Sequence, residues 1–386
     1  MTLDFARFPV IDNHCHPLDP QKAQLDTELL VREFYHGFGD LPKTGVSPRR
    51  WGISESLYHH LPYLGIVQTL IHQLSKVFDC SADIDTVVNA RNRQTQQSLH
   101  EYIQRLYNDA QIVGTVLDSD LPVDDPILNI FPGRLMRLFQ MSPTLSSLLR
   151  SSSSFNELLA SFQIRLDSVI RYQDFVGVKA HLAEEVGFGV RPKPITNSRF
   201  NAAKSGDRSA YQQLYLAVFI ETLRQCQKLG VPVHLHTGLT GGLWDGPVSD
   251  ADPFQIVWLL RQPEFIQTRI VFLHGAYPWI QHAAAVAHAL PHVWVDLSWT
   301  TPWIAQRIVE CYRDAIGMMP LSKLMIGSGG HGIPEIAWLS AKTAKIALKE
   351  VLEDNVKRNL LGFEQAEQIG RMILHDNAAR LYGLLK

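Results

Sequence analysis

The second half of the chain alternates short runs of apolar, mostly β-branched residues with longer stretches of helical pattern. The helical stretches also end as helices should; the stretch 211–229, for instance, is followed by Gly230 and Pro232. Alternation of this kind is the signature of βαβ units, which build a parallel sheet. The predicted strands are 175–179, 233–236, 270–274, 293–296 and 323–327, and the predicted helices are 211–229, 253–261, 279–289, 302–315 and 334–352.

Three earlier strand candidates, 9–12, 112–117 and 135–139, bring the number of predicted strands to eight. Eight parallel strands with intervening helices close into a (β/α)8 barrel, the TIM barrel. A barrel of this type takes about 250 residues, so the 386 residues of the chain leave room for insertions. We therefore predict an α/β fold with a single domain over residues 1–386, formed by a TIM barrel with C-terminal helices.

The segment 20–108 is too long to be a loop without structure of its own. Its pattern is mostly helical, so we predict a helical insertion after the first strand that caps the mouth of the barrel. Within it, Arg49-Arg50-Trp51 either holds an anionic substrate or forms a solvated surface pair. The serine run 151–154 is expected to be a loop that starts a helix rather than an interdomain linker.

Composition excludes several classes of partner. The chain is 46% hydrophobic and 19% charged, as in ordinary globular proteins, and its formal net charge of −2 offers no basic surplus for binding nucleic acid. No stretch reaches the roughly 18 apolar residues of a membrane span, and residues 1–7 do not resemble a signal peptide. The four cysteines, Cys15, Cys80, Cys226 and Cys311, are scattered as in a reducing compartment. We expect a cytoplasmic protein with a small-molecule substrate, with no nucleic-acid or membrane partner, and homo-oligomerisation left open.

His14 and His16 follow the first predicted strand, and the two-residue period of a strand places both imidazoles on one face. A His-x-His pair alone is more often structural. In a parallel barrel, however, the carboxyl ends of all strands form one active-site face. His236 and His274 end the fifth and sixth predicted strands. The sequence therefore predicts four imidazoles at one mouth, which indicates a metal site.

Other polar residues at the strand ends allow more than one interpretation. Lys179 ends the fourth predicted strand and could be carbamylated to bridge two metals, grip a substrate carboxylate as an ammonium, or point outward. His181 is expected to be a wall residue, and His234 a hydrogen-bonded histidine deeper in the barrel. Asp296 either orients a histidine or caps the following helix.

Several segments together resemble a known family, the amidohydrolase-2 type of the amidohydrolase superfamily, and more closely its branch related to nodulin-type and glutamine-synthetase-fused hydrolases. They are distributed in the same order over almost the whole predicted barrel. The segments are Ile11-Asp12-Asn13-His14-Cys15-His16, Gly177-Val178-Lys179, His234-Leu235-His236-Thr237-Gly238, Leu273-His274-Gly275-Ala276-Tyr277-Pro278, Val295-Asp296-Leu297-Ser298, and Lys323-Leu324-Met325-Ile326-Gly327-Ser328 leading to His331 and Pro334-Glu335.

The resemblance implies roles for individual residues. His14, His16 and His236 look like metal ligands, and His274 looks like the histidine that either binds metal or polarises the scissile carbonyl. The resemblance also includes Lys179 in the site. Neutral imidazoles suit zinc, although manganese and iron accept the same ligands. A metal-bound water would have its pKa lowered to about 7 and could attack a carbonyl carbon.

The chain departs from the family pattern after the eighth strand. The family places an aspartate there, as metal ligand and general base, whereas this chain has Gly329 in the segment Gly327-Ser328-Gly329-Gly330-His331. His331 is then the nearest residue to relay a proton. If the missing carboxylate limits catalysis, Gly329→Asp should raise both metal affinity and turnover. A second departure is Glu184-Glu185, where the related branch has an arginine.

The function that the sequence predicts is metal-dependent hydrolysis of a C–N bond in a small carboxylate-bearing substrate. A decarboxylase or lyase of such a substrate is a related alternative. Because Gly329 replaces the aspartate, a weakened or non-catalytic binding protein is the other hypothesis.

Overall fold

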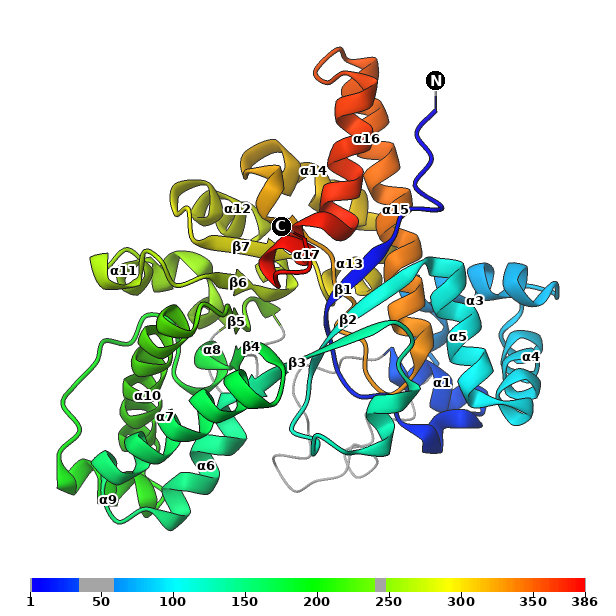
Figure 1. Cartoon of the computed structure of the whole chain (residues 1–386). Coiled ribbons are helices and arrows are strands. Elements are labelled where there is room, and N and C mark those ends of the chain that lie inside the picture. Colours follow the sequence, from blue (N-terminus) through cyan, green and yellow to red (C-terminus); the bar gives the residue numbers. More distant parts are fainter. Residues whose placement is uncertain (1, 35–58, 240–247, 386) are drawn as a thin grey trace.

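The computed structural model describes residues 2–34, 59–239 and 248–385, and it contains one eight-stranded parallel sheet. The strands are hydrogen-bonded in sequence order from β1 to β8 (Figure 1). The strand bounds are β1 Val10–Cys15, β2 Ile112–Asp118, β3 Arg134–Gln140, β4 Phe175–Ala180, β5 Val233–Leu235, β6 Ile270–Phe272, β7 Val293–Asp296 and β8 Leu324–Met325.

The chain that follows β8 meets the free edge of β1 and nearly closes the barrel. Asn13 N donates to Ile326 O at 3.0 Å, Gly329 N donates to His14 O at 2.7 Å, and His16 N donates to Gly330 O at 2.7 Å. The predicted (β/α)8 TIM barrel is confirmed. These bonds also hold the residues that follow β8 directly against His14 and His16, so that the loop after β8 forms part of the mouth.

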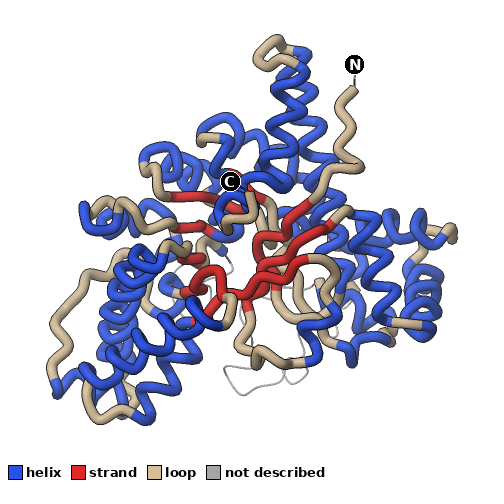
Figure 2. The backbone as a smooth tube through the Cα atoms, in the orientation of Figure 1, coloured by secondary structure: helices blue, strands red, loops and turns tan. Residues whose placement is uncertain are grey.

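Helices surround the strands, as Figure 2 shows with helices in blue and strands in red. Ser154 caps the helix that follows the serine run, because its Oγ accepts from Glu157 N at 3.3 Å, as predicted. The helices are α1 Thr27–Glu33, α3 Gly65–Phe78, α4 Ile84–Gln97, α5 Leu99–Ala110, α6 Met141–Ser151, α7 Phe155–Tyr172, α8 Leu182–Glu185, α9 Asn197–Lys204, α10 Arg208–Leu229, α11 Val257–Leu260, α12 Ile280–Ala289, α13 Thr300–Trp303, α14 Ile308–Met318, α15 Pro334–Lys357, α16 Phe363–Arg371 and α17 Asn377–Leu381.

Several predicted elements end differently in the structure near the mouth. The fifth and eighth strands, predicted over 233–236 and 323–327, end at Leu235 and Met325. The sixth strand was predicted to reach His274 but ends at Phe272, and Leu273–Ala276 form a 3-10 turn in which His274 has a φ of +65°. The predicted helix 302–315 is divided into α13, a 3-10 turn and α14. Thr300, the first residue of α13, donates through Oγ1 to His274 O at 2.6 Å. This bond holds the start of α13 against the turn that contains His274.

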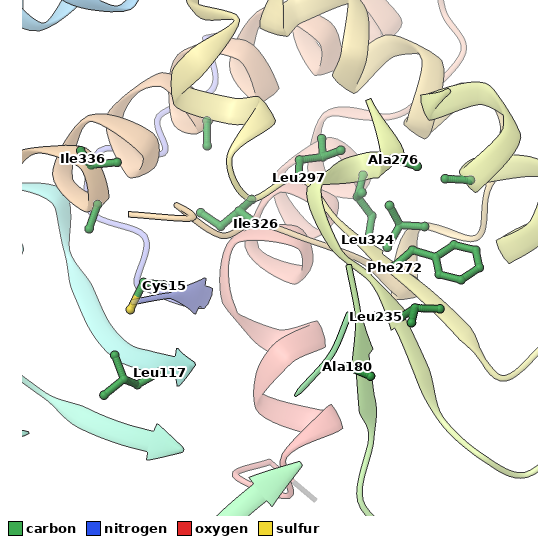
Figure 3. Packing of buried hydrophobic residues seen from close by; sticks show 14 of the residues in the cluster. Cys15, Leu117, Ala180, Leu235, Phe272, Ala276, Leu297, Leu324, Ile326 and Ile336 are labelled. Atoms are coloured by element: carbon green, nitrogen blue, oxygen red, sulfur yellow. The ribbon is translucent and has the colours of Figure 1, made fainter. Parts of the chain in front are cut away.

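The apolar core has two parts. One lies between the strands and the outer helices, and it includes Leu117, Leu235, Phe272 and the buried Cys15 (Figure 3). The other contains alternate strand residues such as Val116, which face the inside of the barrel, together with residues of α17. Because β-strand side chains alternate, Asp118 lies on the same inward face as Val116.

The described part of the segment 20–108 is helical. Helices α3, α4 and α5 lie beside the barrel, where α5 and α3 pack against α15 (Figure 1). The segment reaches the mouth at two points: Arg91 of α4 pairs with Glu335 at the start of α15, at 2.5 Å, and Trp303 Nε1 donates to Phe34 O at 3.0 Å. The expected contribution of 49–51 lies outside the described residues, so capping of the mouth stays a prediction.

Over the described ranges, no helix is both long and apolar enough to cross a membrane.

Candidate metal and active site

His14 and His16 lie at the end of β1, and their rings are 4.9 Å apart between centroids in an edge contact. His14 is completely buried, whereas the His16 side chain is 35% exposed and faces the mouth. Neither ring nitrogen of His14 has a hydrogen-bond partner within the described part of the chain. Burial of an unpaired polar group costs free energy, so these two nitrogens are the feature that most needs an explanation.

His236 and His274 come to the same place from β5 and β6. The ring centroids of His236 and His274 are 4.4 Å apart, and those of His14 and His274 are 5.3 Å apart. The structure therefore brings together the four imidazoles that the strand-end rule predicted. The positions of the four rings do not by themselves assign a role to each ring.

Asp296, at the end of β7, orients His274. Its Oδ1 accepts from His274 N at 3.1 Å and from Ser298 Oγ at 2.5 Å, and its Oδ2 accepts from Asn13 Nδ2 at 2.6 Å. Because Ser298 Oγ donates its proton to Asp296, it accepts from His274 Nδ1, 2.9 Å away. The neutral His274 ring is then protonated on Nδ1, and its lone pair is on Nε2. Of the two predicted roles for Asp296, the structure favours the orienting role.

Asp118, at the end of β2, was missed in the sequence analysis. It is completely buried, and its Oδ2 accepts from Lys179 Nζ at 2.8 Å and lies 3.8 Å from His16 Nδ1. Its Oδ1 accepts from Gln140 Nε2 at 2.8 Å. Its position in the sequence could have indicated it, because Asp118 directly follows the predicted strand 112–117. His236 was singled out because it ends another predicted strand. Lys179 is also fully buried, so its outward-pointing alternative is wrong.

A second donor group lies on the other side of His236. Glu184 of α8 approaches His236 Nδ1 at 3.6 Å and His181 Nε2 at 3.9 Å. His181, expected as a wall residue, thus lies beside the four imidazoles, with its ring centroid 5.5 Å from that of His236. The departure from the family pattern at Glu184 places a carboxylate at the edge of the site.

Electrostatics keep the site histidines neutral. Burial, together with the Lys179 ammonium and the neighbouring imidazoles, lowers the pKa of His14 well below its usual value. Burial and the neighbouring His274 do the same to the pKa of His236. Burial would raise the pKa of Asp118, but the charge of Lys179, the neighbouring His16 and His181 and the hydrogen bond from Lys179 together outweigh burial and hold that pKa well below the usual range. The carboxylate is therefore ionised and the imidazoles are in their ligand form.

His234 and Tyr382 lie below the imidazoles. Burial lowers the pKa of His234 to about 3, and its Nε2 is 2.7 Å from Tyr382 Oη. Tyr382 Oη in turn donates to Asn13 Oδ1 at 2.6 Å, so His234 Nε2 is the donor in its own bond. The expectation of a hydrogen-bonded core histidine is confirmed.

Gly329 has no space for a side chain. Its φ is +60°, and a Cβ built on its backbone would lie 2.8 Å from Trp299 N and 3.0 Å from Trp299 Cα. His331, two residues on, stacks on Trp303 with centroids 5.9 Å apart, and its Nδ1 donates to Gly329 O at 3.5 Å. His331 thus lies at the rim of the mouth, near His16, whose pKa is lowered to about 4 mainly by burial and to a smaller extent by Lys179 and His331.

A family model described as amidohydrolase matches residues 155–384, which is more than half of the chain. The chain belongs to the amidohydrolase family. It is 24% identical to the protein fluG of Emericella nidulans over 97% of its own length, and it spans 46% of that protein, less than half.

Several solved structures share the fold of this amidohydrolase-family chain. A protein of Lactobacillus casei, named as a metal-dependent hydrolase, superimposes with a TM-score of 0.81 at 17% identity, covering 98% of this chain and 96% of that one. The glucuronate isomerase of Caulobacter crescentus gives 0.68 at 14% identity, covering 98% and 92%. At these identities the likeness concerns the fold.

The residues present fit a divalent metal ion. The donor atoms of His14, His16 and Asp118 all lie within 4.8 Å of one another, and so do those of His181, Glu184 and His236. An ion would give one of the two buried ring nitrogens of His14 the partner that it lacks among the described residues. The family and these two groups together support a divalent metal at this end of the barrel.

Proposed function

We propose that this protein is a metal-dependent hydrolase that cleaves an amide-type C–N bond in a small carboxylate-bearing substrate. The observation that carries the proposal is the group of four imidazoles at the carboxyl ends of β1, β5 and β6, with the nitrogens of His14 buried and unpartnered among the described residues. Binding of a small molecule in a reducing cytoplasm, without nucleic acid or membrane, is part of the proposal, and the oligomeric state is left open.

In this proposal His14, His16 and His236 hold the metal. Their neutral imidazoles suit zinc, and manganese or iron would accept the same donors. When bound, the ion would acidify a water and polarise the substrate carbonyl. The protein contributes the arrangement of the donors, because His14 and His16 share one strand end and His236 faces them from β5.

His274 is placed to handle the proton. Its Nδ1–H is held by Ser298, so that Nε2 carries the lone pair and can accept a proton from the attacking water. The predicted role of polarising the carbonyl before attack would need an N–H at Nε2, so the Nδ1–H tautomer supports the role of proton acceptor instead. The imidazolium can then donate to the carbonyl oxygen or to the leaving nitrogen.

Lys179 is proposed to bind the substrate carboxylate as an ammonium. Its Nζ already donates to a carboxylate, Asp118, at 2.8 Å. Carbamylation of Lys179 would instead place a second anion against this buried carboxylate, so the ion pair favours the ammonium over the bridging carbamate. His331, stacked on Trp303 at the rim, is proposed to relay the proton between the site and solvent.

The test combines metal content with turnover. Elemental analysis of the protein purified without chelator should find a divalent ion, and His14→Ala with His16→Ala should abolish it. His100→Ala, on the exposed start of α5, is the control and should retain the metal. In a panel of N-acyl amino acids, His274→Gln should lower kcat by roughly 10²–10⁴-fold, the usual contribution of a general base.

Two results would contradict the proposal in different ways. Unchanged metal stoichiometry in the His14→Ala, His16→Ala variant would mean that the two histidines are structural. A metal-loaded protein that binds carboxylates but turns over no amide would favour the non-catalytic binding protein, for which the absence of a side chain at Gly329 is the supporting observation.

A further inference from the structure

We propose that Asp118 of β2 is the carboxylate ligand of the metal centre, and that metal binding releases Lys179 from Asp118 toward the substrate. The inference rests on the proposed function, because it names a ligand of that same site. It assigns a metal ligand to β2, a strand that was not expected to contribute to the chemistry. It also means that Lys179 pairs with Asp118 before the metal binds and with the substrate carboxylate afterwards.

The register of the sheet places Asp118 beside the histidine pair. Cys15 of β1 pairs with Leu117 of β2, so the next residue on each strand, His16 and Asp118, lie at the same level. The distance of 3.8 Å between His16 Nδ1 and Asp118 Oδ2 is close to the separation of roughly 3.3–3.6 Å expected for two donors on one tetrahedral zinc ion with bonds of about 2.0–2.2 Å.

The burial of both Asp118 and His14 supports the assignment of Asp118 as a metal ligand. Asp118 and His14 are 1% and 0% exposed, and the ring nitrogens of His14 face no hydrogen-bond partner among the described residues. A buried carboxylate is usually retained where it pairs with a cation. The loop after β8 cannot provide a carboxylate at Gly329, because Trp299 fills the space that a Cβ would need. Among the described residues, Asp118 is the carboxylate that groups with His14 and His16.

Lys179 competes for the same oxygen. Its Nζ donates to Asp118 Oδ2, the atom that also approaches His16, whereas Gln140 holds the other oxygen. A divalent ion bound to Asp118 Oδ2 would repel the ammonium, since two cations would share one carboxylate oxygen. Lys179 would then turn to a carboxylate of the substrate. The competing interpretation is that Asp118 serves only as the counter-ion of Lys179.

Removal of Lys179 separates these two interpretations. If Asp118 is a ligand, Lys179→Gln removes its competitor, and the affinity for Co²⁺ and Zn²⁺, measured by titration calorimetry, should stay the same or increase. Adding Asp118→Asn to Lys179→Gln should then weaken metal binding by roughly tenfold or more. Loss of a residue that only hydrogen-bonds to a metal ligand typically costs at least this much, so loss of a direct ligand should not cost less. The Co²⁺ absorption spectrum should change as well, because an oxygen donor is lost.

The double variant removes one positive and one negative charge, so it leaves no unpaired buried ion to prevent folding. Asp109→Asn with Lys342→Gln removes another carboxylate–lysine pair, at 3.0 Å on the outside of the barrel, and should bind Co²⁺ as the unmodified protein does. Equal Co²⁺ affinity and spectra in Lys179→Gln and in the double variant would overturn the role of Asp118 while the metal centre stands. No Co²⁺ or Zn²⁺ binding by the unmodified protein would overturn the metal centre itself.

Discussion

Replacement of Gly329 is expected to destabilise the protein, not to restore activity. From the sequence alone, Gly329→Asp should supply the missing carboxylate and raise metal affinity. In the structure, Gly329 N donates to His14 O at 2.7 Å, and its Cα faces the backbone of Trp299. Trp299 N itself donates to Ser328 O at 3.0 Å, so the obstructing backbone is held in place.

The cost has two sources. A left-handed backbone costs a residue other than glycine about 1–2 kcal/mol. Insertion of atoms into a packed site costs about 1–3 kcal/mol, and a Cβ only 2.8 Å from Trp299 N makes such overpacking unavoidable. Gly329→Ala should therefore lower the free energy of unfolding by about 2–5 kcal/mol. Gly329→Asp should cost at least as much.

Gly383 provides a matched control for the backbone contribution. Its φ is +72°, close to that of Gly329, and no heavy atom lies within 4 Å of a Cβ built there. Gly383→Ala should therefore cost only about 1–2 kcal/mol. The three variants are compared by urea denaturation followed by circular dichroism, with Co²⁺ titration of the same samples.

Two results would refute this reasoning. Equal destabilisation by Gly329→Ala and Gly383→Ala would show that Trp299 yields without cost. A stable Gly329→Asp variant with tighter Co²⁺ binding would show that the loop can accept the carboxylate, and it would remove the argument that Asp118 is needed in its place.

Three further predictions concern residues around the barrel. Glu335→Gln should cost about 3–5 kcal/mol in urea denaturation because it leaves the buried Arg91 unpaired, whereas Arg91→Met with Glu335→Leu should cost less. Burial lowers the pKa of Lys345 from 10.5 to about 8, so on raising the pH the folded protein loses this proton before the unfolded chain does. The free energy of unfolding of the unmodified protein, relative to that of Lys345→Met, should therefore rise between pH 8 and 10.5, by up to roughly 1.4 kcal/mol per pH unit. Below pH 8 this difference should be constant. Asp296→Asn should reduce Co²⁺ affinity or kcat/KM by roughly 10–100-fold through the lost orientation of His274.

The strands could be predicted from sequence because runs of four to six mostly apolar residues indicate strands that are buried on both faces. The ends of elements near the mouth could not. His274 was placed at the end of a strand, yet it lies in a 3-10 turn with a φ of +65°. That conformation depends on Asp296 and Thr300, which bond to the His274 backbone from more than 20 positions along the chain.

The histidines of the site could be predicted because each follows a strand, and the strand-end rule is local. Asp118 satisfies the same rule but was not singled out, because one aspartate after a strand is usually a turn residue. The role of Asp118 becomes apparent only from its contact with Lys179, which is 61 residues away in the sequence. The absence of space at Gly329 likewise depends on Trp299, a contact that no local pattern records.

The charge of the site bears on the choice of substrate. The imidazoles of His14 and His236 are neutral because burial lowers their pKa values, and the Lys179 ammonium is balanced by Asp118. A divalent ion would add two positive charges beside this pair, in a region of low dielectric constant. Asp296, which bonds to the His274 backbone, and Glu184, which lies beside His236, are further carboxylates of the site, but neither of them contacts Lys179. If the ion draws Asp118 away from Lys179, the buried ammonium loses its counter-ion, and this is the physical reason to propose a carboxylate on the substrate.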